Sequence, residues 1–213
     1  MAAYFQIHPK DPQPRLIAQA AEIIRNGGLV AFPTDSAYAL GGRMGDATLL
    51  ERIRRIRGVD DRHLFTLVCR DLSEIATYAR VDNAQYRMLK AATPGSYTFI
   101  LEGTKELPRR VLHPKRKTIG LRVPDHALVL ALLAELNEPL LSSTLILPDD
   151  VEPLCDAEDI RDRLDKLVDV IIDAGPCGGG MTTVINLVGG GAELIRAGCG
   201  PLEPFGLSDS AVD

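Results

Sequence analysis

The sequence lacks tryptophan, and aromatic residues make up only 5% of its 213 positions. Its four cysteines (Cys69, Cys155, Cys177 and Cys199) form no C-x-x-C pair, which argues against a disulfide framework or a zinc site and favours reduced thiols. No apolar run approaches the roughly 20 residues that cross a bilayer. The N-terminus also lacks the basic start, apolar core and cleavage site of a signal peptide. We therefore expect a cytoplasmic protein with no membrane partner.

The composition is that of a globular protein, with 46% hydrophobic and 25% charged residues, and it excludes disordered and collagen-like chains. A chain of this length can bury about 70% of its unfolded surface without help from metals or disulfides. No internal repeat or long linker interrupts it. The sequence thus predicts one domain over residues 1–205 and a frayed tail over 206–213.

The net charge of −5 conceals an asymmetry along the chain. The part before Pro148 has 20 basic and 15 acidic residues, whereas the part after it has 4 basic and 14 acidic residues. Arginine dominates the basic clusters at 43–70 and 105–122, and its guanidinium fork suits phosphate better than an ammonium does. The clusters are either solvated faces balanced by nearby carboxylates or, as we favour, a site for nucleotide or RNA phosphates.

Hydrophobic periodicity and turn residues predict alternating helices and strands. Helices are expected at 13–25, 46–56, 126–136 and 160–167, with two short ones opened by capping boxes at Asp71 and Asp82. Strands are expected at 29–32, 65–69, 97–102, 118–123, 140–147, 168–172, 182–188 and 193–196. This alternation predicts an α/β fold with a mixed or mostly parallel sheet.

Several common catalytic motifs are missing, because the sequence contains no P-loop, no H-E-x-x-H and no G-x-S-x-G. The histidines are scattered: His8 and His63 are expected to be exposed, and His113 lies in a basic stretch. Only His126, in the segment RVPDH, has neighbours that suggest a site.

Hydroxyl residues and arginines recur near the predicted strand ends. A single threonine there is most simply a β-forming residue. Together they could bind phosphates and a small polar substrate, because ligands of open α/β sheets bind at the carboxyl ends of strands. With no evident nucleophile, the compatible chemistry is transfer at phosphorus, where positioning and charge neutralisation do most of the work.

Six ordered motifs resemble the YrdC-like family, and most closely its YciO branch. They are PTDSAYALG at 33–41, RRIR at 54–57, TPGSYT at 93–98, KTIGLRVPDH at 117–126, MTTVIN at 181–186 and IRAG at 195–198. The resemblance implies a single twisted mixed sheet with helices packed around it and a concave basic groove.

The resemblance also implies an activity. Active relatives condense ATP, L-threonine and bicarbonate into threonylcarbamoyl-AMP and pyrophosphate for tRNA modification, and a magnesium ion is expected with the ATP. By carry-over, Thr34, Thr98, Thr118 and Arg122 bind the substrate, and Arg122 holds the threonine carboxylate. Arg55, Arg57, Thr182 and Arg196 bind the nucleotide, whereas Arg55, Arg57 and Thr144 form the catalytic set. No protein-bound metal is expected.

The chain departs from the pattern of active synthases at several positions. The family's Lys-x-Arg is matched to Arg55 and Arg57, and its Ser-x-Asn to Thr144 and Ile146. Ile146 cannot hydrogen-bond through its side chain, and the loss of such a contact typically costs on the order of 10² to 10³ in rate. A family histidine is also replaced, by Cys69. These departures predict weakened synthase activity.

Three functions remain open from the sequence. The first is a slow threonylcarbamoyl-AMP synthase, and the second is a non-catalytic module that binds double-stranded RNA or tRNA. A third is a hydrolase that acts on ATP or an adenylate. The sequence pI of about 5.4 weighs against the RNA module, since nucleic-acid-binding domains usually have a pI above about 9.

Overall fold

The computed structural model describes residues 1–178 and 180–208. Within them the strands form one ten-stranded sheet in the order β1-β8-β2-β3-β7-β4-β6-β5-β9-β10. The strands are β1 (Ala3–Gln6), β2 (Val30–Phe32), β3 (Ala39–Arg43), β4 (Thr66–Val68), β5 (Tyr97–Glu102), β6 (Thr118–Arg122), β7 (Leu140–Thr144), β8 (Val170–Asp173), β9 (Thr183–Asn186) and β10 (Glu193–Arg196). Parallel and antiparallel pairs alternate irregularly, so the predicted α/β fold with a mixed sheet is confirmed.

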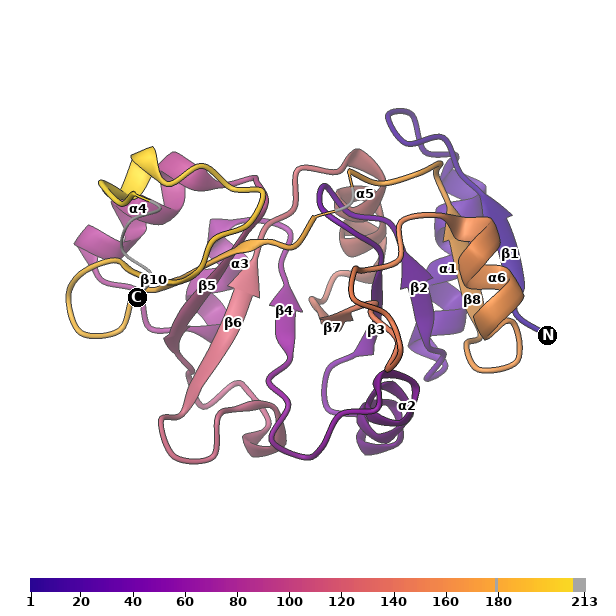
Figure 1. The fold of residues 1–213 in the computed structure, drawn as a ribbon, viewed down its shortest axis with the longest axis horizontal. Coiled ribbons are helices and arrows are strands. Elements are labelled where there is room, and N and C mark those ends of the chain that lie inside the picture. The colour runs from indigo at the N-terminus through magenta and orange to yellow at the C-terminus, as the bar shows by residue number, and fades with distance from the viewer. Residues whose placement is uncertain (179, 209–213) are drawn as a thin grey trace.

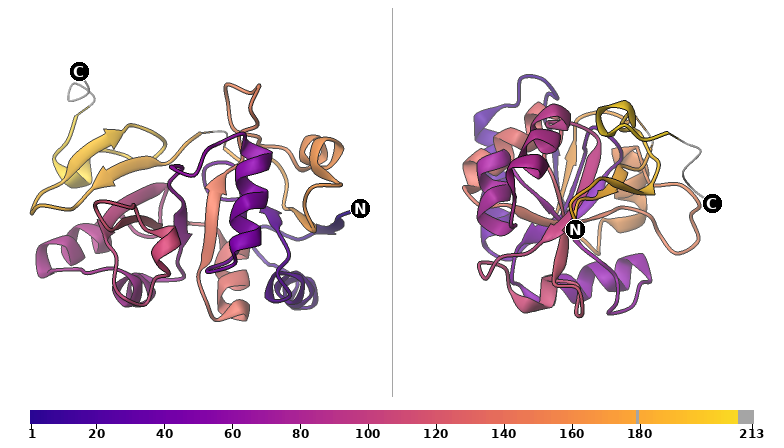
Figure 2. Two further views of the ribbon diagram at one scale, coloured as in Figure 1. Left: turned by 90° about the horizontal axis from the view of Figure 1, so that it is seen from below. Right: turned by 90° about the vertical axis from the view of Figure 1, so that its left-hand side faces the viewer.

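Six α-helices cover this sheet in the described part of the chain. They are α1 (Pro14–Arg25), α2 (Ala47–Arg57), α3 (Leu72–Tyr78), α4 (Asn83–Ala92), α5 (Ala127–Leu136) and α6 (Ala157–Leu164). Two 3-10 turns, η1 (Arg109–Val111) and η2 (Glu203–Phe205), complete the elements. Figure 1 shows β1, α1 and α6 at one end of the sheet and β5, β10 and α4 at the other. Viewed end-on in Figure 2, the strands fan out because the sheet is twisted.

Both faces of the sheet are buried under helices near β2 and β8. Val30 and Phe32 of β2 belong to the core beneath α1 and α5, whereas Ala31 between them belongs to the core on the other face. Ile171 of β8 likewise faces away from its neighbours Val170 and Ile172. Since alternate residues of a strand point to opposite faces, this region is a sheet between two helical layers.

The helix α2 lies within one residue of its predicted range of 46–56 at both ends. The Asp46 side chain accepts hydrogen bonds from the backbone N–H of Thr48 (2.8 Å) and Leu49 (3.2 Å), which caps the first turn. Gly58 ends the helix with a left-handed φ of 62°. The sheet-facing side is apolar, and Arg57 is the last helical residue, which places its side chain at the end of the helix beside the sheet.

The structure differs from the sequence prediction at several elements. β1 and β3 were not expected, and α6 begins three residues earlier than predicted, at Ala157. The capping box at Asp82 is present, but at Asp71 only half of one forms, because the Glu74 carboxylate accepts from Arg70 N instead. The ends of β7 and β9 are also shorter than expected.

Three further expectations concern the whole chain. No helix of the described residues is long and apolar enough to cross a membrane, and a cytoplasmic location stays a prediction. All four cysteines are free thiols. In the expected tail, Leu207 packs against the core, and residues 209–213 lie outside the described part.

Candidate functional site

A cavity of about 510 Å³ lies over the middle of the sheet. Its floor consists of residues two apart along neighbouring strands, such as Thr98 and Ile100 on β5 or Ser142 and Thr144 on β7. Residues at this spacing share one face of a sheet. The end of α2, the segment around His113 and the last strand β10 contribute the walls.

The absence of a side chain at Gly120 keeps the floor open. Gly120 pairs with Thr66 on β4 and with Ile100 on β5. A Cβ atom at this position would lie 3.0 Å from Thr98 Cγ2 and 3.2 Å from Thr66 Oγ1. These distances are shorter than ordinary van der Waals contact, so a larger residue here would crowd the two hydroxyl residues and fill space in the cavity.

At one end of this floor, two threonine hydroxyls lie next to an arginine. The Oγ1 atoms of Thr98 and Thr182 lie 2.8 Å apart. Arg196 on β10 donates from Nη2 to the carbonyl oxygen of Thr182 (2.9 Å) and to its hydroxyl (3.3 Å). These contacts fix the guanidinium of Arg196 beside the cavity.

A separate part of the lining joins Arg57, Ser143 and His63. Arg57 donates from Nη1 to Ser143 Oγ at 2.6 Å and from Nε to the Ile146 carbonyl oxygen at 3.2 Å. His63 Nε2 lies 2.9 Å from Ser143 Oγ and 3.4 Å from Arg57 Nη1. The ring of His63 also packs edge-on against Phe65, with centroids 5.2 Å apart. Three polar groups thus converge at one point of the lining.

A buried network of Asp35 and Arg122 lies at the end of β6. The Asp35 carboxylate forms an ion pair with Arg122, and Arg122 Nη1 lies 3.4 Å from Ser36 Oγ. The Ser36 hydroxyl is in turn 3.0 Å from Thr34 Oγ1. Arg122 lines the cavity, and its Nε is buried without a hydrogen-bond partner among the described residues.

The lining is strongly basic. Arg57, Arg116, Arg122 and Arg196 line it with two histidines and seven hydroxyl residues, and no aspartate or glutamate of the described residues lines it. Burial lowers the pKa of Arg57, Arg122 and Arg196, because desolvation disfavours the charged form. Arginine nevertheless stays protonated in proteins. The cavity therefore holds buried positive charge.

The structure brings together most of the residues expected from the sequence. Those that line the cavity are Arg57, Thr98, Thr118, Arg122, Thr144, Thr182 and Arg196. Thr34 is buried and does not line the cavity. Its hydroxyl donates to the Ala37 carbonyl oxygen at 2.6 Å and is linked to the lining residue Arg122 through Ser36. Arg55 is exposed on α2 and outside the lining. On this geometry we leave Arg55 out of the site.

The histidines differ from expectation. His63 was expected to be exposed, but it is half-buried in the cavity wall, and His113 lines the cavity as well. Burial and the nearby Arg57 and Arg54 lower the pKa of His63 to about 4. His126 precedes the first residue of α5 and is outside the lining. No local pattern in the sequence identifies His63, because its partner Ser143 is 80 residues away.

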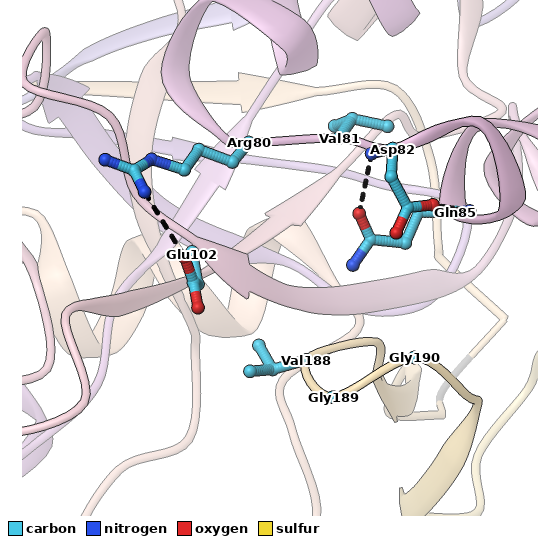
Figure 3. Close-up of a pocket in the computed structure, with 8 residues that line it drawn as sticks. All are labelled: Arg80, Val81, Asp82, Gln85, Glu102, Val188, Gly189 and Gly190. Atoms are coloured by element: carbon cyan, nitrogen blue, oxygen red, sulfur yellow. Dashed lines mark hydrogen bonds and ion pairs between the residues drawn. The ribbon is translucent and has the colours of Figure 1, made fainter.

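A second cavity, of about 400 Å³, lies between the end of β5 at Glu102, the start of α4 and the turn that follows β9 (Figure 3). Its polar groups are engaged with each other: Arg80 pairs with Glu102 at 3.8 Å, and the Gln85 side chain accepts from Asp82 N at 2.8 Å. The Arg80 and Glu102 side chains are 75% and 52% exposed. This cavity offers a ligand no buried charge.

The described residues contain no cluster that could hold a metal ion. No group of three or more His, Cys, Asp or Glu side chains with suitable positions occurs among residues 1–178 and 180–208.

The buried Cys69, which the motif resemblance matches to a histidine, is also outside the cavity lining. The thiol is fully buried, and burial raises its pKa well above the ordinary value. Its environment is that of an inert core residue.

Comparison with known proteins defines the class of protein to which this fold and cavity belong. The family model for Sua5, YciO and YrdC proteins, described as "Telomere recombination", matches residues 22–198. The chain belongs to this family. The resemblance seen in the motifs is thereby confirmed.

Within the family, the chain is similar over nearly its whole length to YciO of Escherichia coli. That protein, named "Uncharacterized protein YciO" in strain K12, is 53% identical over 96% of this chain and 100% of its own length. Its crystal structure superposes with a TM-score of 0.92. The similarity therefore includes both the sequence and the fold of the YciO branch.

More distant relatives carry a functional name. Threonylcarbamoyl-AMP synthase of Bacillus subtilis (strain 168) is 29% identical, over 91% of this chain and 55% of the synthase. A crystal structure of Sua5 from P. abyssi complexed with L-threonine matches with a TM-score of 0.86 at 25% identity, over 95% of this chain and 59% of Sua5. The chain thus spans little more than half of these two relatives.

Proposed function

We propose that this protein binds ATP and L-threonine in the arginine-lined cavity and forms threonylcarbamoyl-AMP with bicarbonate, releasing pyrophosphate, at a rate reduced by Ile146. The observation that carries the proposal is that Arg57 and Arg196 lack a carboxylate counter-charge. Both are half-buried in the lining, and neither has a carboxylate partner in the described part of the chain. Unpaired buried charge is costly, and a bound polyanion would compensate both groups.

The lining residues suit transfer at a phosphorus centre. In such reactions catalysis is almost entirely positioning and charge stabilisation. Arg57 and Arg196 would bind phosphate oxygens from two parts of the lining, and charge-assisted bonds of this kind are about twice as strong as neutral ones. Thr98, Thr118 and Thr144 would position the substrate by hydrogen bonds. Arg57 would also neutralise charge that develops on the departing pyrophosphate.

Arg122 requires a change in the role carried over from the resemblance. Its guanidinium already has a carboxylate partner in Asp35, so a threonine carboxylate would not be its first counter-charge. The unpartnered Nε of Arg122 would donate to a ligand oxygen at the floor of the cavity. Thr34 would support this geometry through Ser36 rather than touch the ligand.

Magnesium would enter as part of the substrate. The described lining offers hydroxyls but no carboxylate, and magnesium sites in proteins commonly combine one or two carboxylates with substrate phosphates. The residues present do not fit a resident magnesium ion, so the metal would be held by the phosphates of ATP and its waters.

The test is to incubate the protein with labelled ATP, L-threonine, bicarbonate and magnesium, and to follow pyrophosphate and threonylcarbamoyl-AMP beside an active synthase. Product that requires both threonine and bicarbonate would support the proposal. Pyrophosphate or phosphate released without that requirement would point to hydrolysis of ATP or an adenylate. No turnover, together with no binding of ATP, would overturn the proposal.

A second candidate is binding of double-stranded RNA or tRNA. It is favoured by a basic segment next to the cavity, in which Arg116 lines the cavity and the neighbouring cations are exposed: Lys105, Arg109, Arg110, Lys115 and Lys117. If these residues neutralise several phosphates, log affinity should fall with log salt at about −0.9 per contact for a duplex. A flat salt dependence would exclude this function.

A further inference from the structure

The contact between His63 and Arg57 is unusual for two groups that can both carry positive charge. His63 Nε2 lies 3.4 Å from Arg57 Nη1, and both atoms are within hydrogen-bond distance of Ser143 Oγ. Like charges this close disfavour each other. The arrangement is acceptable in the free protein because the imidazole can be neutral and accept the Ser143 hydroxyl proton, while Ser143 Oγ accepts from Arg57.

The groups around His63 explain why it is neutral without a ligand. Arg57 and Arg54 face it from α2, Asp60 from the preceding loop, and Ser143 from β7. Burial and the two arginines lower its pKa to about 4, and only Asp60 acts in the opposite direction. Arg54 is engaged by Glu51 at 2.7 Å, whereas Arg57 has only neutral partners.

We propose that His63 is an anion-binding residue of the cavity, which takes up a proton when a phosphate group binds beside Arg57 and Ser143. This inference rests on the proposed function, because it requires a phosphate-bearing ligand in the cavity. The ligand class is a pyrophosphate or the phosphate chain of a nucleotide. An oxygen of a multiply charged phosphate group would take the place of Ser143 Oγ. It would accept hydrogen bonds from both the His63 imidazolium and the Arg57 guanidinium, so the two cations would share one counter-charge.

Linkage makes the consequence measurable. If the anion binds the protonated form of His63 more tightly, the bound anion must raise the proton affinity of His63 by the same factor. We expect a tenfold effect, which corresponds to a pKa higher by about one unit. The contribution of His63 to anion binding should therefore be larger at pH 5 than at pH 8.

The experiment uses nuclear magnetic resonance of the histidine side chains between pH 4 and 8, with and without saturating inorganic pyrophosphate at constant ionic strength. The His63 signal is the one that disappears in His63→Gln, whereas His8→Gln removes an exposed histidine remote from the cavity. Through-bond assignment of the unmodified protein identifies the same signal if His63→Gln does not fold. We expect the His63 titration to move up by about one pH unit with pyrophosphate, while the signal of His8 does not respond to pyrophosphate.

A second readout is the pyrophosphate affinity of the two variants. His63→Gln should weaken binding about twofold at pH 5, where only part of the His63 population is protonated, and little at pH 8, and His8→Gln should bind as the unmodified protein does. Pyrophosphate that shifts amide signals of Thr98 and Thr182 without moving the His63 titration would overturn this inference and leave the proposed function standing. No pyrophosphate-dependent change anywhere in the cavity would overturn both.

Discussion

The Asp35 carboxylate contacts the Arg122 guanidinium in a buried ion pair whose two side chains are 10% and 8% exposed. Asp35 also accepts from the backbone N–H of Asp125 and from the Ser96 hydroxyl, each at 3.1 Å. One carboxylate therefore joins the loops that follow β2 and β6 to the start of β5. These three segments position one end of the cavity.

Replacing Asp35 should destabilise the protein strongly. Asp35→Ala leaves Arg122 buried without a counter-charge, and breaking a buried pair in this way costs about 3 to 5 kcal/mol. The free energy of unfolding in urea measures the loss. Glu102→Ala, which removes the exposed partner of Arg80, should cost less than about 1 kcal/mol. Equal costs for the two variants would contradict the central role of Asp35.

Arg57→Ala should lower turnover by about 10²-fold or more, because it removes a cation expected to contact the transferring phosphates. Its lost hydrogen bonds to Ser143 and Ile146 should cost about 1 kcal/mol and a few degrees of melting temperature. Arg55→Ala, two residues away on the exposed side of α2, is the matched control. Rate and melting temperature together distinguish the outcomes, and equal rate losses would return Arg55 to the catalytic set.

Ile146→Asn should raise the rate of threonylcarbamoyl-AMP formation by about tenfold to 10²-fold. The substitution places an amide in the cavity lining where the synthase pattern has one, and it restores a polar contact to developing charge. Ile195→Asn is the control, because it places the same amide at another lining position that is 48% exposed. It should give no increase in the rate. If Ile146→Asn leaves the rate unchanged, this departure does not limit the activity.

Gly120→Ala should weaken ligand binding more than it weakens the fold. The new methyl group would lie 3.0 Å from Thr98 and 3.2 Å from Thr66, so these two side chains, which line the cavity, must shift. Such overpacking typically costs about 1 to 3 kcal/mol. Gly191→Ala, where a Cβ atom meets nothing within 4 Å, should leave both affinity and stability unchanged. Calorimetric titration with ATP and urea unfolding provide the two measurements.

His63 should make the protein less stable as the pH falls from about 6.5 to about 4. Its pKa in the folded protein is about 4, whereas in the unfolded chain it is about 6.5. Between these values the unfolded state binds more protons, so the free energy of unfolding decreases with decreasing pH. The difference between the unmodified protein and His63→Gln isolates this contribution from that of the carboxylates. A difference that does not change with pH would contradict the neutral state of the buried ring.

The elements missed from the sequence have identifiable causes. β3 contains Gly41 and Gly42, and glycine is depleted in strands. A Cβ at Gly42 would approach Leu49 of α2 to 2.7 Å. Leu49 therefore occupies the space that a side chain at position 42 would need. β1 is a short edge strand that pairs only with β8, more than 160 residues away. Long amphipathic helices such as α1 were predictable because their periodicity is local.

The site was predictable in part for the same reason. Threonines and arginines at strand ends were identified by type and position, and helical spacing could also have separated Arg57 from Arg55. Arg57 lies four residues after the buried Ile53 and thus on the same side of α2. The convergence of His63 with Ser143, and of Asp35 with Arg122, depends on the order of strands in the sheet, which local sequence does not specify.

The pairing of β1 with β8 has a consequence for synthesis on the ribosome. Ala3 pairs with Val170, and Gln6 with Asp173. Most of the chain must therefore be synthesised after β1 before its partner β8 is available. At about 5 to 20 residues per second, that interval is on the order of ten to thirty seconds. The apolar face of α1 has no complete sheet to cover during this time. A nascent chain of this topology therefore depends on chaperone protection more than a protein whose neighbouring strands are consecutive.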